Sequence, residues 1–67
     1  MSKEIEQHIK EAVSNLIADT GSIEDARRVI LYGKSKATTD NMFNYITDKE
    51  LEVKLAYLQL ILDELDK

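Results

Sequence analysis

Residues 48–67 read DKELEVKLAYLQLILDELDK and form the most strongly helical segment of this 67-residue chain. Leucines recur there at steps of four and three, which places one apolar stripe along an α-helix: Leu51, Leu55, Leu58, Leu62 and Leu65. At about 100° per residue, a second apolar set falls on roughly the opposite side: Val53, Tyr57, Leu60 and Ile61. A helix that is apolar on two sides needs two packing partners, and so short a chain hardly supplies both. The second side therefore indicates self-association or binding to another protein.

The start of this segment carries a signal of its own. Thr47-Asp48-Lys49-Glu50 matches a capping box, in which the Thr and Glu side chains satisfy free amide groups at a helix start. We therefore predict a break at Thr47, with a short helix over residues 40–46 and a long helix over residues 48–66. The alternative is one continuous helix, because a Thr-Asp pair is tolerated inside a helix.

Two further helices are predicted upstream. The first runs over residues 3–19, with Ser2 as its N-cap and Gly21 just beyond its end. Its apolar stripe comprises Ile5, Ile9, Ala12, Val13, Leu16 and Ile17. The second runs over residues 23–32 after the N-cap Ser22.

The middle of the chain is predicted to contain the one real loop. Gly33 is expected to end the second helix, because glycine readily adopts the left-handed conformation found just past a helix end. Residues 34–39, which are rich in Ser, Thr and Lys, then form the loop.

These segments predict an all-α fold, a small three- to four-helix bundle that makes up a single domain over residues 1–67. We expect the first helix to pack antiparallel to the last, with the short middle helices crossing at one end. Further apolar residues would complete the core: Ile23, Val29, Ile30, Met42, Phe43 and Ile46. A domain of this size buries only about 60% of its unfolded surface, and without Cys it has no disulfide, so oligomerisation is the remaining support.

Composition limits the partners that we expect. The net charge of −4 disfavours a general nucleic-acid binder, because neutralising phosphates requires a surplus of Lys and Arg. No segment approaches the roughly 20 continuous apolar residues that span a bilayer. The charged N-terminus also lacks the apolar core of a secretory signal. We therefore expect a cytoplasmic protein without membrane association.

Basic residues gather in the centre of the chain, where no acid occurs from Ala26 to Thr39: Arg27, Arg28, Lys34 and Lys36. They are candidate contacts for an anion or a partner, although they also suit a solvated helix face that pairs with the chain's own acids. One alternative function is a helix-turn-helix-like nucleic-acid-binding protein that uses this cluster, but the would-be recognition helix over residues 40–46 contains no Arg or Lys. A second alternative is an acidic mimic of nucleic acid, although the basic centre interrupts any anionic strip.

No catalytic constellation is found. His8 is the only imidazole, and it shares a helix face with Glu4 and Glu11 at a spacing that is frequent by chance. We expect no metal, no cofactor and no enzymatic activity. The expected function is a non-enzymatic protein–protein interaction module, a regulator or inhibitor that binds another protein. We also expect a homodimer formed through the second side of the last helix.

Overall fold

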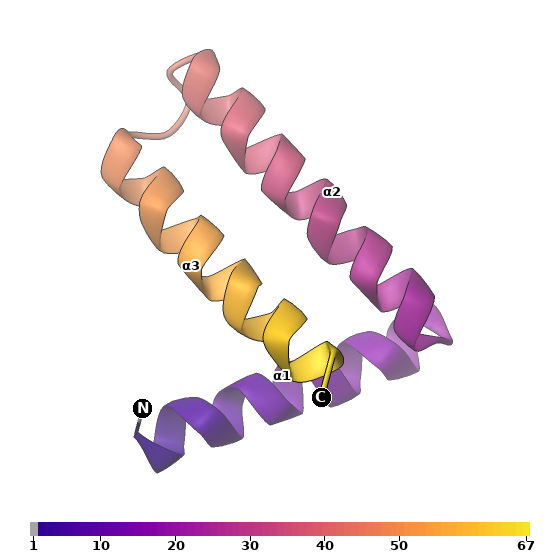
Figure 1. Ribbon diagram of the computed structural model, residues 1–67. Coiled ribbons are helices and arrows are strands. Elements are labelled where there is room, and N and C mark those ends of the chain that lie inside the picture. Colours follow the sequence, from indigo (N-terminus) through magenta and orange to yellow (C-terminus); the bar gives the residue numbers. More distant parts are fainter. Residues whose placement is uncertain (1) are drawn as a thin grey trace.

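The computed structural model describes residues 2–67, which form three helices and no strand, so the predicted all-α class is confirmed (Figure 1). Helix α1 spans Lys3–Thr20, α2 spans Ile23–Met42 and α3 spans Asp48–Leu65. Helices α2 and α3 form an antiparallel hairpin, and α1 crosses the open end of that hairpin (Figure 1). The Cα atoms extend over 32 × 28 × 16 Å, so the molecule is thin in one direction.

The prediction that the first helix packs antiparallel to the last is wrong. The antiparallel neighbour of α3 is α2, and α1 lies across both near one end (Figure 1). Helix α2 has 20 residues, so at 1.5 Å per residue it is about 30 Å long and runs beside the whole of α3. A second helix ending near Tyr32 would have been too short for this role.

Gly33 lies inside α2, so the predicted helix end at Tyr32 and the predicted loop over residues 34–39 are wrong. The separate helix predicted over residues 40–46 is also wrong, because residues 40–42 end α2 and residues 43–46 form a turn. A glycine inside a helix costs about 1 kcal/mol relative to alanine, which tertiary packing can outweigh. Here Ala37 is buried one turn later, and Leu58 Cδ1 lies 3.6 Å from the position that a Gly33 Cβ would occupy. The chain has no Pro that would stop the helix.

Three of the four predicted helix starts are confirmed, and the start predicted at residue 40 is wrong because that residue lies inside α2. The side chains of Ser2, Ser22 and Thr47 each accept a hydrogen bond from the backbone N–H three residues later, at 3.1–3.2 Å. The capping box is complete, because Glu50 Oε1 also accepts from the Thr47 N–H at 3.2 Å. The chain therefore breaks at Thr47, as predicted.

The core is small and lies where the three helices meet. Its buried members are Ile9 and Val13 of α1, Ala26 and Ile30 of α2, and Ile61, Leu62 and Leu65 of α3. Four residues predicted for the core are instead exposed: Ile23, Val29, Met42 and Phe43. Because α2 continues without interruption, its inner side is the stripe through Ala26, Ile30 and Ala37, and Val29 and Met42 lie off that stripe. Ile23 is the first residue of α2 and Phe43 follows its last residue, so both lie at ends of the helix.

The fold leaves an unusually large surface. Its accessible area is 5022 Å², whereas a monomeric protein of 7.7 kDa typically exposes about 4,300 Å². The Cα radius of gyration is 12.6 Å, compared with about 11 Å for a compact domain of this length. The open packing thus exposes apolar side chains to solvent.

In residues 2–67 no helix combines the length and apolar character needed to cross a membrane.

Candidate interaction surfaces

The turn between α2 and α3 is built by a specific hydrogen-bond pattern. Asn44 has a φ of 63°, in the left-handed region that Asn tolerates better than most residues. Its N–H donates to the Asn41 carbonyl at 3.0 Å, and the Tyr45 N–H donates to the Asp40 carbonyl at 2.8 Å. These two bonds form a Schellman motif, which satisfies carbonyl groups at the end of α2.

Hydrogen bonds from the side chain of Asn41 connect the same turn to the start of α3. Asn41 Nδ2 donates to the Ile46 carbonyl at 3.3 Å and to Asp48 Oδ1 at 2.9 Å. The capping box of Thr47 follows directly. The turn is thus held at both ends, which makes its conformation well defined.

Three large side chains project from this turn into solvent. Met42 is 73% exposed, Phe43 65% and Tyr45 76%, and we call these residues the hydrophobic tip. The rings of Phe43 and Tyr45 lie with their centroids 6.2 Å apart. Aromatic side chains on a rigid support are typical anchors of protein interfaces, because little entropy is lost when they bind.

The sequence pattern alone does not predict the hydrophobic tip. Residues 40–46 fit an amphipathic helix, and this pattern places Met42 and Phe43 in the core. The available signal was Asn44, a residue that favours the left-handed conformation, three positions before the N-cap Thr47. Together they predict a helix end and a helix start within one short turn.

The predicted partner-binding residues of α3 do not share one free surface. Val53 is 60% exposed and Tyr57 39% exposed, but Leu60 is half-buried and Ile61 is in the core at 5% exposure. Helix α1 crosses the C-terminal half of α3 and covers this part of it (Figure 1). The grouping of all four residues into one interface is therefore wrong, and only Val53 and Tyr57 remain accessible.

Val53 and Tyr57 border a shallow apolar depression of about 300 Å³, which Lys54 and Leu58 complete. Tyr57 also contacts α1, because His8 Nε2 lies 3.1 Å from its hydroxyl oxygen. Residues 2–8 are all exposed, so the first turns of α1 extend beyond the hairpin as an overhang.

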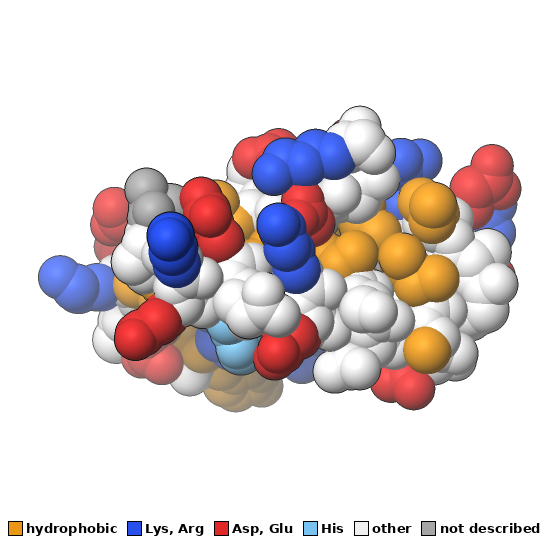
Figure 2. Space-filling view, turned by 90° about the horizontal axis from the view of Figure 1, so that it is seen from below, with side chains coloured by type: hydrophobic (Ala, Val, Ile, Leu, Met, Phe, Trp, Pro, Cys, Tyr) orange, Lys and Arg blue, Asp and Glu red, His pale blue; other side chains and the backbone are white. Residues whose placement is uncertain are grey.

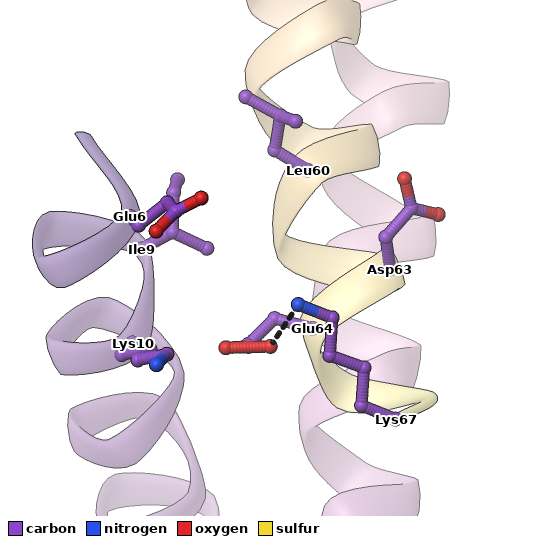
Figure 3. A pocket seen from close by; sticks show the side chains of 7 residues that line it. All are labelled: Glu6, Ile9, Lys10, Leu60, Asp63, Glu64 and Lys67. Atoms are coloured by element: carbon purple, nitrogen blue, oxygen red, sulfur yellow. Dashed lines mark ion pairs between the residues drawn. The ribbon is translucent and has the colours of Figure 1, made fainter. Parts of the chain in front are cut away.

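A second cavity, of about 320 Å³, lies between α1 and the C-terminal half of α3 (Figure 3). Its lining comprises Glu6, Ile9, Lys10, Leu60, Asp63, Glu64 and Lys67. Glu64 and Lys67 form an ion pair at 3.2 Å, and Glu6 and Lys10 reach in from α1 (Figure 3). In the described part of the chain no charged side chain is buried. The cavity is a solvated groove with charges of both signs.

The four central basic residues all lie on α2, and each meets a partner within the chain. Arg27 pairs with Asp66, Arg28 with Asp25 at 3.7 Å and Lys36 with Asp40 at 3.2 Å. Lys34 Nζ donates to Gln59 Oε1 at 2.6 Å. These contacts favour the interpretation that the basic cluster pairs with the chain's own polar groups, and two of them bridge α2 to the C-terminal part of the chain.

His8 faces Tyr57, and across residues 2–67 no three His, Asp or Glu side chains come close enough together to hold a metal ion. The surface features that remain are the hydrophobic tip, the overhang of α1 and the depression on α3. Comparisons of the chain with protein-family models, with curated proteins and with solved structures found no match.

Proposed function

We propose that this protein is a non-enzymatic interaction module that regulates or inhibits another protein by binding it through the hydrophobic tip. The observation that carries the proposal is the exposure of Met42, Phe43 and Tyr45 on a turn held by hydrogen bonds at both ends. Large apolar side chains in one exposed cluster typically mark a binding site.

The energetics of the tip suit binding. Full burial of a side chain such as Phe or Met contributes about 1.5–3 kcal/mol, so three anchors supply several kcal/mol before association costs. The Schellman motif and the bonds of Asn41 order the turn before the partner arrives. Less conformational entropy is therefore lost on binding.

The shape of the hydrophobic tip indicates what kind of surface the partner presents. A protruding cluster of one aliphatic and two aromatic side chains fits a concave apolar pocket that encloses it. We expect the partner to supply such a pocket, with the Tyr45 hydroxyl remaining at its polar rim.

Affinity capture from the host tests the proposal. The tagged chain should retain a protein that mass spectrometry identifies, and the purified protein should bind the chain in a titration. Phe43→Ala and Tyr45→Ala should each weaken that binding at least tenfold. Both side chains are mostly exposed, so both variants should keep the helical circular dichroism spectrum.

The matched control is Tyr32→Ala, which removes a 69% exposed aromatic side chain from the middle of α2. It should change the affinity less than twofold. Equal losses at Tyr32 and at the tip, or no loss at the tip, would contradict the proposal.

A further inference from the structure

We infer that the partner bound by the hydrophobic tip also lays an amphipathic helix with an acidic edge across the depression on α3. This second contact rests on the proposed function, because both contacts belong to one partner. The residues that carry it are Val53, Lys54 and Tyr57, which line the depression. The helix of the partner places an apolar side chain in the depression and an Asp or Glu opposite Lys54.

The hydrophobic tip alone is too small for a stable interface. Its three side chains are 65–76% exposed, and at roughly 200 Å² for each large side chain they offer on the order of 400 Å². A stable interface buries about 800 Å² on each partner. The partner must therefore contact further surface of the chain.

Surface next to the hydrophobic tip is available, because the outer part of the hairpin is almost uncovered. Among residues 33–58, which we call the hairpin arm, only Ala37 is buried. The chain as a whole exposes about 700 Å² more than a typical monomer of its mass. A partner that covers one side of the hairpin arm gains the remaining area that a stable interface needs.

Helix α1 indicates what kind of element packs on α3. It crosses the C-terminal half of α3, where Ile9 and Val13 share one core cluster with Ile61 and Leu65 (Figure 1). The depression lies on the other half, which α1 leaves open. The first ten residues of α3, 48–57, extend over about 15 Å, and a helix with its side chains is about 10–12 Å wide. One further crossing helix therefore fits between the hydrophobic tip and α1.

The charge at the depression determines the polar edge of that helix. Lys54 is the charged member of the lining, and within residues 2–67 it has no ion-pair partner. The other lysines of the arm differ, because Lys34 bonds to Gln59 and Lys36 pairs with Asp40. An unpaired cation beside an apolar hollow favours a carboxylate across the interface. The helix of the partner therefore carries Asp or Glu at the edge of its apolar side.

The opposite end of the molecule has a different character. The side of α1 away from the hairpin carries charged side chains of both signs along its N-terminal part (left in Figure 2). The groove between α1 and the C-terminal half of α3 is also lined by charges of both signs. An apolar helix side therefore packs more favourably on the hairpin arm, next to the hydrophobic tip.

Photo-cross-linking at position 53 tests the shared interface. A benzophenone side chain placed there in the native host should link to the same protein as the group at position 43. Val53 is 60% exposed, so this variant should keep the helical circular dichroism spectrum. Mass spectrometry should map the adduct to a helical segment of the partner with Asp or Glu beside its apolar residues. The matched control replaces Leu31, which is 50% exposed on α2, and it should form no adduct.

Charge reversal tests the acidic edge in a titration with the purified protein that cross-links at position 43. Lys54→Glu should weaken binding at least fivefold, and Lys54→Arg should change it less than twofold. The matched control is Lys49→Glu, which makes the same change of charge five residues earlier, about 140° away around α3. It should change the affinity less than twofold. Added salt should weaken the parent complex more than the Lys54→Gln complex, because salt screens the ion pair.

An adduct at position 43 without one at position 53 would overturn the second contact and leave the proposed function intact. Adducts with two different proteins, or an adduct at position 53 with another copy of this chain, would also overturn it. Equal losses for Lys54→Glu and Lys49→Glu would contradict the acidic edge. An adduct at position 53 without one at position 43 would contradict the proposed function and, with it, the shared partner.

Discussion

His8 and Tyr57, which are 49 positions apart, join the first helix to the last through a hydrogen bond of 3.1 Å between Nε2 and the hydroxyl oxygen. Their ring centroids lie 6.0 Å apart. The contact lies between the overhang of α1 and the depression on α3. It thus adds a polar contact to the apolar packing that holds α1 across the hairpin.

A double-mutant cycle measures this contact. His8→Ala and Tyr57→Phe each remove the hydrogen bond, so each should lower the free energy of unfolding by about 0.5–1.5 kcal/mol. Because the two residues act on each other, the double variant should lose less than the sum of the single losses. Urea denaturation gives all three values, and strictly additive losses would show that the contact contributes nothing.

Ile61 and Val53 should respond differently to truncation, although both belong to the second apolar side of α3. Ile61 is 5% exposed in the core, so Ile61→Ala should cost about 2–5 kcal/mol and can unfold so small a domain. Val53 is 60% exposed, so Val53→Ala should cost well under 1 kcal/mol in the monomer. Thermal unfolding at low protein concentration, below about 5 μM, compares the two. A larger loss at Val53 would contradict the placement of α1 over Ile61.

The two glycines should give opposite results when replaced by alanine. Gly33 lies inside α2 with room for a Cβ at van der Waals distance from Leu58, so Gly33→Ala should stabilise the protein by about 0.5–1 kcal/mol. Gly21 has a φ of 94°, so Gly21→Ala should destabilise it by about 1 kcal/mol. Denaturant midpoints measure both changes, and a loss of stability for Gly33→Ala would show that α2 ends there.

Thr47→Ala should lower stability by about 0.5–2 kcal/mol, because it removes the side chain that caps α3. The control is Thr39→Ala, on the exposed side of α2, which should change stability by less than about 0.5 kcal/mol. Equal effects at the two positions in chemical denaturation would contradict the capping box.

The parts of the fold that the sequence predicted are those set by local interactions. Ser2, Ser22 and Thr47 cap helices because their hydroxyls reach amides only three residues away. The leucine stripe of α3 follows from helix geometry alone, and its members Leu62 and Leu65 are buried in the core.

The missed parts depend on contacts between distant segments. Helix α2 continues through Gly33 because α3 packs beside it. The residues next to Gly33 in the sequence do not indicate that contact. Ile61 is covered by α1, whose crossing direction depends on the whole core. A helix end at Gly33 implies a separate helix for Met42 and Phe43, and that helix would bury both side chains. The hydrophobic tip therefore cannot be predicted without knowing that α2 continues to Met42.

Site-specific photo-cross-linking tests the central claim, that the hydrophobic tip is the binding site, most directly. A benzophenone side chain placed at position 43 in the native host should form one covalent adduct with a different protein, and the same group at position 32 should form none. Adducts of equal yield at both positions, or adducts at position 43 only with another copy of this chain, would contradict the claim.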